Sequence, residues 1–99
     1  MVTAAVVAEF EFRPGNEAAI EEFFRQGRSI VEGQPPTTQW FAYRRGPTTY
    51  GAFAVFANQA DREALLSAGG PRASRENAHL FERAPSFEKV DIVAARTAG

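Results

Sequence analysis

The sequence predicts an α+β fold in which a four-stranded antiparallel sheet carries its helices on one face. Three observations lead to this prediction. Short segments rich in apolar and aromatic residues read as strands, two longer segments have helical periodicity, and together they follow the order β-α-β-β-α-β. The chain has 99 residues, which is the size of a single domain, and we expect that domain to span residues 1–99.

The first expected strand covers residues 2–12, and its even positions form an apolar face: Ala4, Val6, Ala8, Phe10 and Phe12. A Pro-Gly pair then breaks the strand, and Asn16 is expected to cap the next helix through its side-chain oxygen. That helix should run to about Val31, because its apolar residues recur at intervals of three and four. Gly27 lies within the apolar stripe, which predicts a close approach of the helix to the sheet.

Residues 38–45 and 50–56 are predicted to form a β-hairpin, since both are rich in aromatic residues and residues 46–49 have turn chemistry. Pairing of Arg45 with Tyr50 would place Phe41 and Tyr43 on one face of their strand. The other face would then carry Trp40, Ala42 and Arg44. Neither face of the hairpin is polar, so both faces need a cover, and the helices supply only one.

The second half of the chain repeats the helix-then-strand pattern. Asn58 is expected to cap a short helix that buries Leu65 and Leu66, and residues 67–71 interrupt that helix. A second helical piece is predicted over residues 72–83, and the last strand over residues 86–96. Because the strands are apolar on both faces, we expect a second copy of the chain to cover the open face in a barrel-like homodimer.

Composition argues against several classes of partner. The chain has 11 basic and 12 acidic residues and a net charge of −1, so neither nucleic acid nor an anionic membrane is expected as a partner. The longest apolar run, residues 3–8, is too short to cross a membrane and lacks the basic start of a signal peptide, which predicts a cytoplasmic protein. One His and no Cys predict no metal site, and no glycine-rich phosphate loop is present to bind a flavin cofactor.

Two single features suggest other functions, which the rest of the sequence does not favour. His79, the only histidine, is a tempting general base, but it should point away from the buried side of its helix and be solvated. The strand order is shared with the RNA-recognition motif, and residues 50–55 partly match its third strand. Thr48 and Thr49 stand where that motif has a basic residue and a glycine, so RNA binding is not expected.

Taken together, several segments resemble the antibiotic biosynthesis monooxygenase family. They are F-x-F-R-P-G-N-E at residues 10–17, T-Q-W-F-A-Y-R-R-G-P-T-T-Y-G-A-F-A-V-F at 38–56, D-R-E-A-L-L at 61–66, and L-F-E-R-A-P-S-F-E-K-V-D-I-V-A-A-R at 80–96. The resemblance implies a ferredoxin-like fold and a dimeric α+β barrel. It also implies a monooxygenase that oxidises a small phenolic or quinol-type aromatic with O₂, without a bound metal or flavin.

The sequence departs from the family pattern at one position. Related sequences commonly carry a His where this chain has Leu65, so the usual candidate for a base is missing and no catalytic residue is assigned. The haem-degrading branch of the same fold needs an Asn that the first strand lacks, which disfavours haem as a substrate. The alternative function is a non-catalytic binder of small molecules, or a stress-related structural dimer.

The aromatic residues of the hairpin are the candidate substrate-binding residues. We expect an apolar pocket between the sheet and the helices that accepts a planar phenolic ring, with Arg44 or a Tyr hydroxyl stabilising the oxyanion. The predicted lining is drawn from Trp40, Tyr43, Arg44, Tyr50, Phe53 and Phe56. Trp40, Tyr43 and Tyr50 also have a plain alternative role, as rings of the core or of a dimer interface, and Arg44 has one in a salt bridge at the rim.

Overall fold

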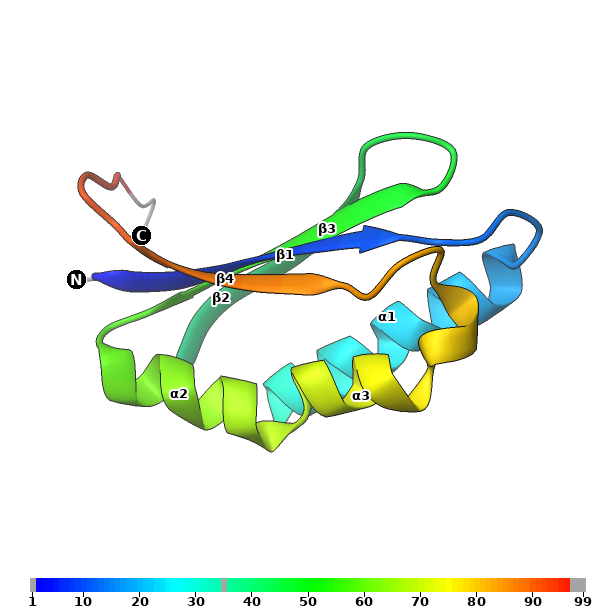
Figure 1. Ribbon diagram of the computed structural model, residues 1–99. Helices are drawn as coiled ribbons and strands as arrows, with labels where there is room; N and C mark the ends of the chain where they lie inside the picture. Colours follow the sequence, from blue (N-terminus) through cyan, green and yellow to red (C-terminus); the bar gives the residue numbers. More distant parts are fainter. Residues whose placement is uncertain (1, 35, 97–99) are drawn as a thin grey trace.

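The computed structural model describes residues 2–34 and 36–96, apart from the side chain of Thr38. Four antiparallel strands form one sheet in the order β2-β3-β1-β4, and the helices lie together on one face of it (Figure 1). This arrangement confirms the predicted α+β fold. The elements are β1 (Ala4–Glu11), α1 (Glu17–Glu32), β2 (Thr37–Arg44), β3 (Thr49–Phe56), α2 (Gln59–Ala68), α3 (Gly70–Glu76), the 3₁₀ helix η1 (Ala78–Leu80) and β4 (Ser86–Asp91).

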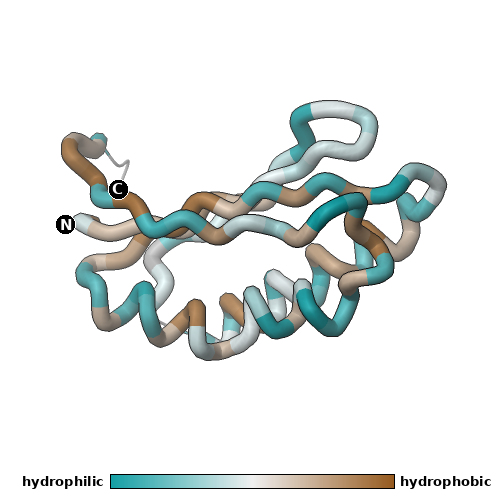
Figure 2. Tube along the Cα trace, viewed as in Figure 1, coloured by the Kyte–Doolittle hydropathy of each residue, from teal (hydrophilic) through white to brown (hydrophobic). Residues whose placement is uncertain are grey.

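The core lies between the sheet and the helices and is formed largely by phenylalanine. The even positions of β1 are buried as predicted, and Phe10 contacts Phe23 and Phe24 of α1 edge-to-face at 5.4 and 5.5 Å between ring centroids. Figure 2 shows hydrophobic positions along the sheet and on the side of the helices that faces it. Two buried clusters result, one around Phe10 and Phe12 and one around Phe56.

The hairpin forms, but its predicted register is wrong by one residue. Arg44, not Arg45, pairs with Tyr50, because the Thr49 carbonyl accepts the backbone N–H groups of both Arg45 and Gly46 at 2.8 and 3.2 Å. These bonds draw Arg45 into the loop and out of the strand ladder. The observed register sets Trp40 opposite Ala54 and leaves small residues beside the indole ring.

Helix α1 keeps its predicted extent but not its predicted cap. The Asn16 side chain makes no capping bond; its amide donates instead to the Arg13 carbonyl at 3.2 Å, and the Asn16 backbone carbonyl accepts from Ile20. The cap predicted for α2 is present, since Asn58 Oδ1 accepts the Asp61 N–H at 2.9 Å. The predicted close approach at Gly27 is also observed, because a Cβ there would lie 3.4 Å from Trp40 Cζ2.

Two predicted elements end earlier than expected. The helix predicted over residues 72–83 stops at Glu76. After η1 the chain turns, and Phe81 forms a β-bridge with Phe12, just beyond the end of β1. The last strand was predicted to reach residue 96 but ends at Asp91. Asp91 pairs with Ala4, the first residue of β1, and one further backbone bond, from the Ile92 N–H to the Thr3 carbonyl, follows that pair.

The face of the sheet away from the helices carries a partly exposed apolar patch, next to Glu9 and Glu88. Phe41 and Tyr43 of β2 are 56% and 39% exposed there, beside the half-buried Val7 and Phe53. We call this surface, formed by Val7, Phe41, Tyr43, Phe53 and Val55, the outer face.

Within the described residues, no helix is both long and apolar enough to span a membrane.

Candidate functional site

An apolar cavity of about 80 Å³ lies between the sheet and the helices. All four strands and helices α1, α2 and α3 contribute to its wall. The lining residues are Val6, Ala8, Phe10, Phe23, Phe24, Gly27, Ile30, Val31, Trp40, Ala52, Ala54, Leu65, Leu66, Gly70, Pro71, Ala73 and Phe87. A concave apolar site at the junction of several elements is typical of a small-molecule pocket.

Small residues create the space. Ala52 and Ala54 of β3 lie next to Trp40 on the helix-facing side of the sheet, where larger side chains would fill the cavity. From the opposite layer, Gly27 of α1 brings the helix backbone against the indole ring. Trp40 therefore forms one wall of the cavity. Its indole ring lies between α1 at Gly27, which has no side chain, and β3 at Ala52 and Ala54, whose side chains are short.

The cavity offers almost no polar chemistry. Of the described residues that line it, Trp40 alone has a polar atom in its side chain, the indole N–H. Leu65, at the position where the family resemblance leads one to expect a His, is buried and lines the cavity. Arg62, one turn earlier on α2, is buried too but points elsewhere, donating from Nη1 to the Val90 carbonyl at 2.9 Å. Among the residues that the structure describes, no titratable side chain lines the cavity and could exchange a proton with a molecule in it.

Of the six residues predicted to bind substrate, Trp40 lines the cavity. Tyr50 lies on the same side of the sheet but packs against Phe12 and Phe24, at 5.2 and 5.5 Å between ring centroids. Phe56 is completely buried in the second core cluster, and Tyr43 and Phe53 lie on the outer face.

Arg44 is held by its own turn. Its Nε donates to the Gly46 carbonyl and its Nη2 to the Pro47 carbonyl, both at 2.8 Å, and its Cζ lies 5.5 Å from the centre of the Tyr50 ring. The guanidinium therefore organises the β2–β3 loop and does not line the cavity.

Sequence reasoning missed the residues that the helices contribute. Phe23, Phe24 and Ile30 belong to the apolar repeat of the first predicted helix, and Ala73 to the helical piece predicted over residues 72–83, but the sequence assigned none of them to the pocket. His79 is exposed on η1, as predicted, and does not line the cavity. No group of three or more His, Cys, Asp or Glu residues that could hold a metal occurs in the part of the chain described.

The chain has a ferredoxin-like α+β fold, and solved structures that include antibiotic biosynthesis monooxygenases share this fold. SnoaB, a cofactor-independent oxygenase from Streptomyces nogalater, superposes with a TM-score of 0.71 over 98% of this chain and 97% of its own, at 17% identity. A proposed antibiotic biosynthesis monooxygenase from Caulobacter crescentus gives 0.73 over 94% and 92%, at 22% identity. At these identities the likeness shows the shared fold.

One comparison is strong enough to define a family. The NE2512 protein of Nitrosomonas europaea, whose function is unknown, is 35% identical over 100% of this chain and 97% of its own, with a TM-score of 0.88. The chain belongs to the same family as that protein. No protein-family model matches the sequence, and no curated protein does.

Proposed function

We propose that the chain is a cofactor-independent monooxygenase that oxidises a small phenolic or quinol-type aromatic with O₂. The observation that carries the proposal is the apolar cavity beside Trp40, in a chain that has the fold of the cofactor-independent oxygenase SnoaB. A dry apolar pocket suits both reactants, since an aromatic ring and O₂ each partition out of water.

The chemistry needs no redox group from the protein. An electron-rich phenolate passes one electron to O₂, the two radicals combine at a ring carbon to give a peroxide, and the O–O bond then breaks. For a simple phenol the sum is phenol plus O₂ giving quinone plus water: one oxygen atom becomes the new carbonyl, the other leaves as water, and the substrate supplies all four electrons.

The tasks left to the protein are binding, orientation and exclusion of water. Trp40 offers a flat surface for the ring and one hydrogen-bond donor for an oxyanion. The described cavity lining supplies no base, so the substrate would have to enter as its anion or lose its proton to solvent near the cavity mouth. Phenols that ionise easily should therefore react fastest.

A second function is favoured by the same lack of a base. With Leu65 in the wall and no titratable group beside it, the cavity is also suited to a protein that binds a small apolar molecule without changing it. The two functions differ in one observable, because both predict binding and only the first predicts consumption of O₂.

The test measures O₂ uptake with a panel of hydroquinones and phenols of graded acidity. Trp40→Phe, which keeps an aromatic ring but removes the N–H donor and one ring of the wall, should lower turnover at least several-fold. Tyr43→Phe, on the outer face, should leave turnover unchanged. Saturable binding without O₂ uptake across the panel would establish the binder instead. Equal turnover in the wild type and Trp40→Phe would place any chemistry outside this cavity.

Leu65→His provides a gain-of-function test. A general base typically contributes about 10²–10⁴-fold, so an imidazole in the wall should raise turnover at least tenfold at pH values where it is neutral. Leu66→His places the same group at a neighbouring lining position and serves as the matched control. An equal effect of both substitutions, or of neither, would show that position 65 has no special relation to the substrate.

We also propose that two copies of the chain associate through the outer face. Exposed Phe41 and Tyr43 and half-buried Val7 and Phe53 form a connected apolar surface in β1, β2 and β3. A second copy brings a matching surface by symmetry, which makes a closed two-fold pair the simplest cover.

A further inference from the structure

A second concave site, a groove, lies on the solvent side of the helices, across Ile30 and Ala73 from the cavity. This groove, of about 340 Å³, follows the seam between α1 and the α2–α3 junction. Its lining residues are Glu22, Arg25, Gln26, Ser29, Ile30, Ala68, Gly69, Arg72, Ala73 and Glu76. Ile30 and Ala73 also line the cavity, so these two side chains form a floor with the groove on one side and the cavity on the other.

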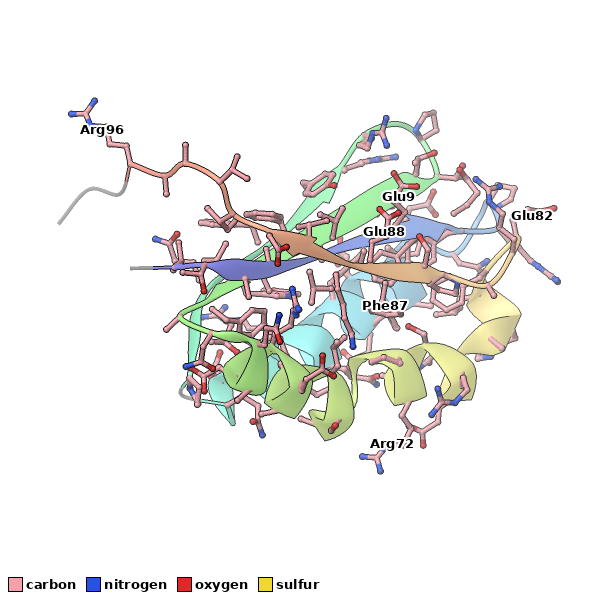
Figure 3. All side chains as sticks on the ribbon, turned by 60° about the vertical axis from the view of Figure 1, so that its left-hand side comes forward. Glu9, Arg72, Glu82, Phe87, Glu88 and Arg96 are labelled. Carbon is pink, nitrogen blue, oxygen red and sulfur yellow. The ribbon has the colours of Figure 1, made fainter. Side chains whose placement is uncertain are left out.

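Gly69, where α2 gives way to α3, lines the groove beside the Ile30 part of the floor. Gly69 has a φ of 146°, and a Cβ built on it would lie 3.5 Å from Ile30 Cδ1 and 3.7 Å from an Arg72 guanidinium nitrogen. The tip of Ile30 and the Arg72 guanidinium therefore both lie beside Gly69 at the seam. Figure 3 shows Arg72 on the side of the helices that faces away from the sheet.

Charge is unevenly distributed along the groove. Arg25 forms an ion pair with Glu22, whereas Arg72 makes no ion pair or side-chain hydrogen bond with any described residue. Glu76 lies one helical turn beyond Arg72. Because α1 and α3 run in opposite directions (Figure 1), Glu76 lies toward the Glu22 end of the groove. The end next to Ile30 is consequently positive.

Size and polarity restrict what the cavity can hold. An engineered cavity of about 150 Å³ binds benzene, so about 80 Å³ has room for no more than a single ring, and only if the floor gives slightly. A polar substituent buried in this apolar wall would lose its hydrogen bonds to water and find at most the Trp40 N–H in return. An anionic group, whose burial costs most, must therefore leave the cavity, and Ile30 separates the cavity from the polar residues of the groove.

We infer that the cavity and the groove form one ligand site, which takes a single-ring aromatic with an anionic substituent. The ring occupies the cavity beside Trp40, and the anion passes Ile30 to reach the Arg72 guanidinium. The inference rests on the proposed function for the aromatic nature of the ring, but it concerns binding and can be tested without turnover. It excludes the multi-ring phenols that a larger pocket in this fold would accept.

Three probes separate charge from ring binding: hydroquinone, 2,5-dihydroxybenzoate and its methyl ester. Binding is measured without O₂ by calorimetry, and by the fluorescence of Trp40, the only tryptophan, which reports directly on the cavity. The acid should bind at least fivefold more tightly than either neutral probe, and raised salt should weaken only the acid. An acid that binds no better than its ester would overturn the inference.

The matched variants are Arg72→Gln and Arg75→Gln. Arg75 lies on the same helix but does not line the groove. Arg72→Gln should weaken binding of the acid about fivefold to tenfold and leave hydroquinone unchanged, while Arg75→Gln should alter neither. Ile30→Phe, which places a larger side chain in the floor, should abolish binding of the acid. Equal behaviour of the two arginine variants would show that the groove is not part of the site.

The outcomes also separate this inference from the proposed function. Selective binding of the acid through Arg72 without O₂ uptake in air would support the combined site and contradict the oxygenase. O₂ uptake that is equal for the acid and its ester, and unchanged in Arg72→Gln, would support the oxygenase and contradict the combined site. If none of the three probes binds, both are wrong.

Discussion

At the scale of the residue, the position of the Tyr43 ring depends on the absence of a side chain at Gly51. Its ring lies flat across β3 at Gly51, where a Cβ would overlap the phenol Cζ and hydroxyl and lie 2.7 Å from Cε1. Only glycine leaves this position open, so residue 51 helps to shape the outer face although it contributes no surface of its own.

Gly51→Ala should displace the Tyr43 ring and destabilise the fold by about 1 kcal/mol. In a Tyr43→Ala background the same substitution should cost much less, because the clash is gone and alanine suits a strand better than glycine. Chemical denaturation of the four proteins gives the coupling energy. Additive costs would mean that Tyr43 does not occupy the space above residue 51.

Sequence reasoning identified Trp40 but not the environment of the other candidates, for a physical reason. A Trp in a hairpin rich in alanine indicates unfilled space, and the observed register places Ala54 opposite Trp40 and the cavity beside it. Arg44 carried no comparable signal. Whether a guanidinium near a turn faces a pocket or bonds its own loop depends on the loop carbonyls, whose directions follow from the turn conformation and not from residue type.

At the scale of the element, the β2–β3 loop is tied to the centre of the sheet by one carboxylate. Glu11 of β1 accepts hydrogen bonds from the Thr48 and Thr49 hydroxyls, at 2.5 and 2.6 Å. These bonds, first from Thr48 and then from Thr49, lower the pKa of the Glu11 carboxyl below its ordinary value, with a smaller contribution from the charge of Arg83.

A lowered pKa in the folded state gives a definite pH dependence. The ionised Glu11 stabilises the fold fully above the pKa that it has in the unfolded chain, and this contribution is lost as pH falls through the lower, folded-state value. Melting temperatures of Glu11→Gln and the wild type should therefore differ at neutral pH and converge in acid. Glu21→Gln, on the exposed side of α1, controls for the loss of a carboxylate elsewhere. A difference that persists unchanged in acid would contradict the assignment.

Helix α2 is held to the sheet by Arg62, whose side chain is almost fully buried. Its Nη1 bonds the carbonyls of Val90 and Ala5, which belong to paired residues of β4 and β1, and Asp91 lies 3.9 Å away. Arg62→Ala should cost about 2–4 kcal/mol, and Arg62→Met clearly less, because methionine restores the aliphatic packing. Urea denaturation gives both values. Equal losses would assign the stabilisation to the hydrogen bonds alone.

The type and order of the elements were predictable, and their ends were not. The even positions of β1 and the apolar repeat of α1 are local patterns, and both are buried as expected. The end of β4 is set by its neighbour, since Asp91 pairs with Ala4, where β1 begins, and only the bond from the Ile92 N–H to the Thr3 carbonyl continues the pairing in the described chain. The early end of α3 has a similar origin, because Phe81 leaves the helical path to pair with Phe12. Such ends depend on contacts far away in sequence.

At the scale of the whole molecule, the outer face predicts assembly. Phe41→Glu places a charge on its most exposed ring and should convert the proposed dimer to a monomer in sedimentation experiments. Ala64→Glu, on the exposed side of α2, should not change the mass. A wild-type protein that is a stable monomer at micromolar concentration would contradict the proposal.

The sheet also brings the two ends of the described chain together. The Ile92 N–H donates to the Thr3 carbonyl at 3.0 Å, so the strands that begin and end the fold leave it at the same place. A short flexible linker could join them at little entropic cost, and new ends could be opened between Gly46 and Pro47. A circularly permuted chain, with the original ends joined by this linker and new ends within the hairpin, should therefore still fold around the same cavity.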